Sequence, residues 1–170
     1  LTKQLIGHGF DGPIYPVTRS QSEILGHKAY RSLADIPEPV DLAVIVVPAA
    51  HVISTIEQCG AKGIPAAVII SSGFGEEKSD EAAQRDAQLR ALAEKLDMAI
   101  CGPNSEGLVN PLRPLVATFS PVFHDTTKKL LPEGGRAKPI AVSCQSGALT
   151  FSFLSRGAAR QSKFTTHVSS

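Results

Sequence analysis

The sequence predicts an α/β fold with a doubly wound parallel sheet, and two observations carry this prediction. Residues 41–48 and 64–73 are continuous apolar runs rich in Val and Ile, which is typical of strands covered on both faces. Between them, Val52, Ile53 and Ile56 recur at helical spacing, so the stretch predicts a β-α-β unit. Such units are parallel and right-handed in nearly all proteins, so both strands are expected to end at one edge of the sheet. Ligands of open α/β sheets bind at that edge.

Local signals predict the elements that surround this unit. We expect the end of a helix before Gly7, a short strand at 12–18 and one helical turn near 32–37. A polar loop follows Gly73, and the next helix begins after Ser79, a residue type that caps helices. The side chains of this loop and the charged residues of the helix, Arg85 among them, are expected to face solvent. Residues 98–101 predict a third parallel strand, and residues 115–119 one more strand of the first domain.

A second α/β domain is expected to begin near residue 139. Pro and Gly interrupt residues 108–139, which favours a domain boundary there. We therefore predict a first domain at 1–121, a linker at 122–138 and a second domain at 139–170. Within the second, residues 139–143 and 165–168 read as strands, and residues 148–159 as a helix that buries Leu149, Phe153 and Leu154.

The composition argues against nucleic-acid and membrane partners. Lys and Arg total 17 against 16 Asp and Glu, and aromatic residues make up only 5% of the chain, so neither a basic surface nor a base-stacking platform is expected. Apolar runs are too short to span a bilayer, and no signal peptide is recognised. The three cysteines are odd in number and lack metal-type spacing, which predicts a reduced, cytoplasmic setting and no metal site. Because the chain opens on Leu1 rather than Met, we interpret it as a piece of something longer.

Three segments that follow the predicted parallel strands form the first candidate site. They are Val47-Pro48-Ala49-Ala50, Ser71-Ser72-Gly73 and Asn104. Pro48 stops its strand without offering a donor, and the two alanines leave room for a ligand across the strand end. An ordinary strand-to-helix turn explains the same residues, so both interpretations stand.

The turn Gln145-Ser146-Gly147 is the second candidate site, for an anion. It links a predicted strand to a predicted helix, where free backbone N–H groups and the positive helix end favour negative charge. The turn lacks the Lys of a P-loop, so nucleoside triphosphate binding does not follow. A capped helix without a ligand is the alternative.

Four motifs resemble, in their order and spacing, the NDP-forming acyl-CoA synthetases and, more distantly, the succinyl-CoA synthetase α subunit. They are Val47-Pro-Ala-Ala50, Val68-Ile-Ile-Ser-Ser-Gly-Phe74, Gly102-Pro-Asn-Ser-Glu-Gly107 and Gln145-Ser-Gly-Ala-Leu149. The resemblance implies a Rossmann-like CoA-binding domain, followed by the start of a flavodoxin-like domain. It also implies an ATP-binding ligase that makes acyl-CoA, NDP and phosphate from an acid, CoA and a nucleoside triphosphate, through an acyl phosphate and a phosphohistidine.

The resemblance also assigns roles to individual residues. Val47, Pro48 and Ala49 would line the CoA cleft, with Ser71, Ser72 and Gly73 at the next strand end. Asn104 and Gly107 would lie near the thiol end of CoA. Gln145, Ser146 and Gly147 would receive the phosphohistidine, with Cys144 where the family has Ser.

Other parts of the family's machinery would lie outside this span. The opening strand and its Gly-rich loop would precede Leu1, and the phosphorylated His would follow Ser170, which leaves no catalytic residue in between. The partners implied are CoA, a small carboxylic acid, a nucleotide-grasp domain or subunit that binds the Mg-nucleotide, and a further copy in a homo-oligomer. Residues 1–170 alone are therefore expected to be inactive. Two other functions stay open: a CoA-sensing regulatory region of a fused protein acetyltransferase, and a non-catalytic nucleotide-binding module.

Overall fold

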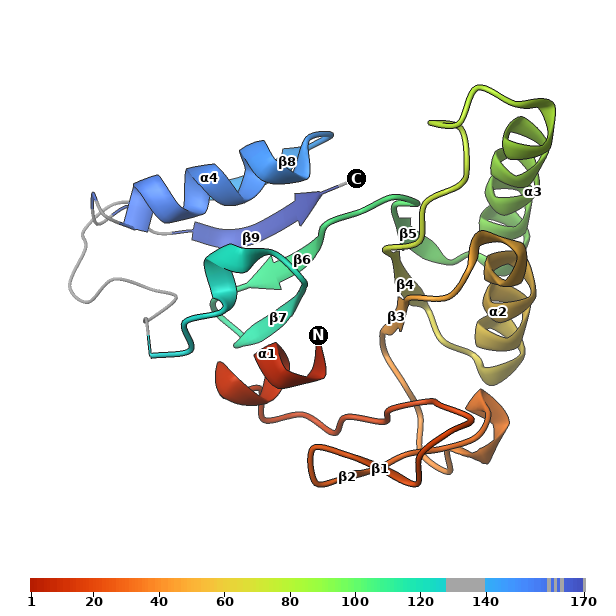
Figure 1. Cartoon of the computed structure of the whole chain (residues 1–170), viewed down its shortest axis with the longest axis horizontal. Helices are drawn as coiled ribbons and strands as arrows, with labels where there is room; N and C mark the ends of the chain where they lie inside the picture. The colour runs from red at the N-terminus through yellow and green to blue at the C-terminus, as the bar shows by residue number, and fades with distance from the viewer. Residues whose placement is uncertain (128–139, 159, 161, 163, 170) are drawn as a thin grey trace. The chain divides into compact units, whose positions relative to one another are not determined.

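The computed structural model in Figure 1 describes residues 1–127, 140–158, 160, 162 and 164–169. They form two compact units. The parallel-sheet unit spans 14–105, and the mixed-sheet unit joins 1–13 to the described residues from 106 onward. The units divide between residues 105 and 106, which lies before the domain boundary expected near Pro121. The limits 1–121, 122–138 and 139–170 stay a prediction, and most of the linker lies outside the described residues.

Three parallel strands make up the sheet of the parallel-sheet unit. They are β3 (Ala43–Ile45), β4 (Ala66–Ile69) and β5 (Ala99–Cys101), in the order β3-β4-β5. Val68 lies at the centre, paired with Val44 on β3 and Cys101 on β5. The connecting helices α2 (Ala49–Lys62) and α3 (Asp80–Leu96) pack against each other beside these strands (Figure 1). The predicted α/β fold with a parallel sheet is confirmed.

The core of this unit explains why the apolar runs form buried strands. Val52, Ile56 and Cys59 recur on one face of α2 and are fully buried against the sheet residue Ile69. Burial raises the pKa of the Cys59 thiol to about 11, so this cysteine is neutral at physiological pH. It therefore serves as a small apolar core residue.

The segment before β3 is less regular than the sequence predicts. A two-stranded hairpin, β1 (Glu23–Ile24) with β2 (His27–Lys28), precedes the short 3₁₀ helix η1 (Leu33–Asp35). The prediction of a strand at 12–18 is wrong, because this segment forms only an isolated bridge between Val17 and Tyr30. Pro16 lacks a backbone N–H, which shortens the ladder that this segment can build.

The mixed-sheet unit contains four strands and two α-helices. Its elements are α1 (Thr2–Gly7), β6 (Gly107–Asn110), β7 (Leu115–Thr118), η2 (Pro121–Phe123), β8 (Ile140–Cys144), α4 (Gly147–Ala158) and β9 (Phe164–Ser169). The strand order is β7-β6-β9-β8. Strands β8 and β9 are parallel and joined by α4, which confirms the strand, helix and strand predicted in this part of the chain. The strand expected at 115–119 lies in this sheet, antiparallel to β6, and not in the first one.

Helix α4 buries a different face from the one expected. Leu149 and Phe153 are 50% and 48% exposed, whereas Phe151 and Leu154 are buried. The ring of Phe151 meets Phe123 edge-on, with 5.4 Å between the ring centroids. Apolar residues occupy more than one stripe of this helix, so its periodicity alone does not select the buried side. Of the three residues expected in the core, only Leu154 is there.

Candidate functional site

The carboxyl ends of β3, β4 and β5 lie at one edge of the parallel sheet, as predicted. All three strands run in the same direction, so the segments that follow them emerge together. Val47-Pro48-Ala49 follows β3, Ser71-Ser72-Gly73 follows β4, and Asn104 follows β5. This is the edge at which open α/β sheets bind ligands.

Ser71 ties the ends of β3 and β4 together. Its hydroxyl donates to the carbonyl oxygen of Val47 at 2.6 Å and accepts from the backbone N–H of Val47 at 3.1 Å. Its own carbonyl accepts from the N–H of Asn104 at 2.9 Å, which adds the end of β5. The Ser71 side chain therefore faces the protein, while the neighbouring Ser72 is exposed.

Small residues at the edge are required by close backbone approaches. Gly73 has φ +97°, and a Cβ at this position would lie 2.9 Å from the Cβ of Ala49, the first residue of α2. Gly102 has φ +101°, and a Cβ there would lie 2.3 Å from the carbonyl oxygen of Ile69. The left-handed backbone at both positions suits glycine. Asn104 has φ +56° and is exposed at the end of this turn.

The loop after Gly73 is held by side chains that sequence reasoning assigned to solvent. We call residues 73–77 the Gly73 loop. Glu76 accepts the backbone N–H of Gly73 at 2.6 Å and that of Phe74 at 3.2 Å. Arg85 of α3 donates from Nε to the Gly73 carbonyl oxygen at 2.7 Å. The one sequence signal for this arrangement is Phe74, an aromatic residue inside a polar loop, which is fully buried.

The electrostatics of Glu76 reflect these contacts. Partial burial alone would raise the pKa of its carboxyl group, but hydrogen bonds from its own N–H and from those of Gly73 and Phe74 lower it overall. A carboxyl group with a lowered pKa is ionised at neutral pH and accepts these bonds in its charged form. As the pH falls through this pKa, the contribution of the bonds to stability is lost.

Gly107 belongs to the mixed-sheet unit, where the packing of two strands explains why the residue is glycine. It opens β6 with φ +120°, and a Cβ there would lie 2.2 Å from the carbonyl oxygen of Ala117 on β7. The close pairing of β6 with β7 at this position therefore requires glycine. Its assignment to the thiol end of CoA stays a prediction.

The turn Gln145-Ser146-Gly147 joins β8 to α4, as predicted. Helix α4 begins at Gly147, and Gln145 and Ser146 are exposed. The Ser146 hydroxyl accepts from the N–H of Leu149 at 3.4 Å, and its carbonyl accepts from the N–H of Thr150 at 3.0 Å. Ser146 therefore caps the helix, and its hydroxyl proton has no acceptor among the described residues.

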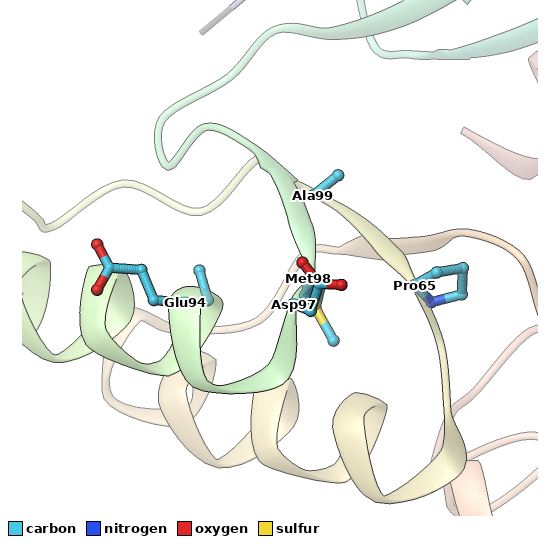
Figure 2. A pocket seen from close by; sticks show the side chains of 6 residues that line it. Pro65, Glu94, Asp97, Met98 and Ala99 are labelled. Atoms are coloured by element: carbon cyan, nitrogen blue, oxygen red, sulfur yellow. The ribbon is translucent and has the colours of Figure 1, made fainter.

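A surface hollow of about 390 Å³ lies at the opposite edge of the parallel sheet. It is lined by Pro65, Ala93, Glu94, Asp97, Met98 and Ala99, which lie at the amino ends of β4 and β5 and the end of α3 (Figure 2). In Figure 2 the carboxylate of Glu94 points away from Pro65 and Ala99. The polar groups do not converge as they do in a typical ligand site.

Among the described residues, no helix is both long and apolar enough to cross a membrane. In the same part of the chain, His, Cys, Asp and Glu side chains form no group of three or more that could hold a metal ion.

Residues 1–111 match the family model described as the CoA binding domain. The chain is 43% identical over 153 residues to the acetate–CoA ligase (ADP-forming) I subunit alpha of Pyrococcus furiosus, covering 88% of this chain and 30% of that protein. It is 34% identical over 164 residues to the 4-hydroxybutyrate–CoA ligase (ADP-forming) of Nitrosopumilus maritimus, covering 96% of this chain and 22% of that protein. The chain thus spans less than a third of either relative.

A solved structure shows the same fold. The apo form of the dinucleotide-forming acetyl-coenzyme A synthetase 1 of Candidatus Korarchaeum cryptofilum matches with a TM-score of 0.81 and 30% identity, over 99% of this chain and 34% of that one. Sequence and structure agree on the same class of relatives. The chain therefore belongs to the CoA binding domain family, with a Rossmann-like α/β fold, and is homologous to part of the ADP-forming acyl-CoA ligases.

Proposed function

We propose that the chain is the CoA-binding portion of an NDP-forming acyl-CoA synthetase. Such an enzyme makes acyl-CoA, NDP and phosphate from a small carboxylic acid, CoA and a nucleoside triphosphate. The observation that carries the proposal is the meeting of Val47–Ala49, Ser71–Gly73 and Asn104 at one sheet edge, within residues that match the CoA binding domain. That edge is where the fold class binds its ligands.

The residues at this edge fit the neutral part of CoA. Pro48, Ser72 and Asn104 are exposed and present an apolar ring, a hydroxyl and an amide. None of them carries a charge, so they match the amides and methyl groups of the pantetheine arm of CoA and not the phosphates elsewhere in the cofactor. In this proposal the small residues Ala49 and Gly73 let the ligand lie close to the backbone.

In the same proposal, the turn Gln145-Ser146-Gly147 receives a phosphorylated histidine. The start of α4 offers backbone N–H groups, and Ser146 offers a hydroxyl proton, to an anion. The phosphorylated histidine and the nucleotide-grasp domain or subunit would come from outside residues 1–170. Residues 1–170 then bind and orient CoA and carry out no chemistry alone.

Replacing Ala49 with Trp tests the proposed CoA site. Ala49 is half-buried at the start of α2 beside Gly73, so an indole there should fill the edge and weaken CoA binding by about tenfold or more, as calorimetry on the full-length protein would measure. Ala61→Trp is the matched control, because Ala61 is exposed near the other end of the same helix. Equal affinities of the two variants would contradict the site, and a wild-type protein that does not bind CoA would contradict the function.

A further inference from the structure

Two side chains outside every motif that predicted the site hold both backbone polar groups of Gly73, the first residue of the Gly73 loop. Glu76 Oε1 accepts the N–H of Gly73 at 2.6 Å, and Arg85 Nε donates to the carbonyl of Gly73 at 2.7 Å. The N–H and the carbonyl of Gly73 are thus both held by side chains. Gly73 and its neighbour Ser72 belong to the proposed CoA site.

The position of Gly73 matters because it faces the start of α2. A Cβ on Gly73 would lie only 2.9 Å from the Cβ of Ala49, so these two backbones approach closely. Phe74, the next residue, is fully buried in the core. A shift of the Gly73 loop would therefore change the spacing between the segments that follow β3 and β4.

The guanidinium group of Arg85 contacts two other residues of the protein. Its side chain is 28% exposed, its Nε bonds to Gly73, and its terminal nitrogen lies 3.8 Å from a carboxylate oxygen of Glu77. An ion pair of that length at the surface contributes little. The hydrogen bond to Gly73 is therefore its main structural contact.

We propose that Arg85 is a positioning residue for the CoA site, and that it acts through its Nε–H donor and not through its charge. It would hold the carbonyl of Gly73 and so fix Ser72 and Gly73 beside Ala49. That the ligand is CoA rests on the proposed function. The hydrogen bond by which Arg85 holds the Gly73 loop does not depend on a ligand.

The chemistry of the side chains offers a sharp set of variants. In Arg85→Gln the amide nitrogen is attached to Cδ, as Nε is in arginine, so a neutral donor stays at the same branch of the side chain. Arg85→Lys keeps the charge but moves the donor one bond further out. Arg85→Ala removes both. Arg90→Ala is the matched control, because Arg90 lies on the same helix, is 77% exposed and pairs with Asp86.

Two measurements on the full-length protein compare the variants. The first is the rate of hydrogen exchange in residues 70–78 without ligand, and the second is the affinity for CoA by calorimetry. Arg85→Ala should speed exchange in this segment and weaken CoA binding by about threefold to tenfold, which is the range expected for one lost hydrogen bond. Arg85→Gln should stay within about twofold of wild type in both measurements. Arg90→Ala should match wild type.

Other results would overturn the inference. If Arg85→Lys retained CoA affinity while Arg85→Gln lost it, and the loss grew at low salt, Arg85 would act by charge on a CoA phosphate. If Arg85→Ala behaved as Arg90→Ala in exchange, the loop would not depend on Arg85. A wild-type protein without CoA affinity would refute the proposed function alone, because the exchange data would still decide the hold on the loop.

Discussion

The hydroxyl of Ser71 shows how a residue can matter to a binding edge without facing the ligand. The side chain is 9% exposed and bonds to both backbone groups of Val47. Those two groups lie beyond the last residue of β3, where the strand ladder has ended. Ser71 therefore links the two segments two residues beyond the ends of β3 and β4, toward the candidate site.

Replacing Ser71 with Ala should destabilise the protein by about 1–3 kcal/mol, because two partly buried polar groups of Val47 lose their partner. Chemical denaturation would measure this change. Ser71→Thr keeps the hydroxyl and should recover part of the loss. Ser72→Ala is the control, since Ser72 is exposed, and it should change stability by less than about 0.5 kcal/mol. A similar stability for Ser71→Ala and Ser72→Ala would refute this account.

Sequence patterns located these residues but not the direction of their side chains. The apolar runs placed Ser71, Gly73 and Asn104 at strand ends, because the strand pattern is local. Whether Ser71 faces the next strand or a ligand depends on the partner strand, which local sequence does not specify. Arg85 was assigned to solvent for the same reason, since its partner is a backbone carbonyl twelve positions away.

At the scale of elements, the ends of β4 and β5 meet so closely that one of them must carry glycine. The carbonyl of Ile69 accepts the N–H of Ser105 at 3.1 Å and leaves no room for a Cβ on Gly102. The turn that presents Asn104 depends on this approach. Gly102 is therefore a structural residue within a motif that the sequence linked to binding.

Gly102→Ala should destabilise the protein more than Gly26→Ala does. Both glycines have positive φ, +101° and +83°, but a Cβ on Gly26 would have no neighbour within 4 Å. Gly26→Ala, the control, is therefore destabilised only by placing alanine at a positive φ. Gly102→Ala should be destabilised by about 1–3 kcal/mol more, because its Cβ would clash with Ile69. Thermal and chemical unfolding of the two variants would measure the difference. Equal destabilisation would contradict the predicted clash.

Elements with local signals were predicted well, and elements that depend on distant partners were not. Ser79 caps α3 as expected, with its hydroxyl accepting from the N–H of Ala82 at 3.2 Å. Strand β7 was recognised as a strand of the first predicted domain, but the sheet in which it pairs was not predicted. Its place follows from β6, whose Val109 pairs with Val116 on one side and His167 on the other. Such pairing is not encoded near either segment.

At the scale of the whole molecule, each compact unit has a core of its own. Ile56 and Ile69 belong to the core of the parallel-sheet unit, and Val116 and Phe151 to that of the mixed-sheet unit. A chain with separate cores can lose one while retaining the other.

Single core truncations should therefore act locally. Ile56→Ala removes a fully buried side chain and should cost about 2–5 kcal/mol in the parallel-sheet unit, speeding hydrogen exchange in β3, β4 and β5. Val116→Ala should do the same to β6 and β7. Exchange measured by mass spectrometry would show which strands respond. If either variant speeded exchange equally in both sheets, the two units would unfold as one.

The strand pairing also sets the order in which the chain can fold as it leaves the ribosome. The parallel-sheet unit is continuous, so its strands are all available once residue 105 has emerged. The mixed-sheet unit is discontinuous: α1 packs on β7, and β6 pairs with β9, which ends at Ser169. Synthesis proceeds from the amino terminus, so α1 waits until long after its own translation for the sheet that covers it. Residues 1–13 are thus among the last of residues 1–170 to reach their final packing.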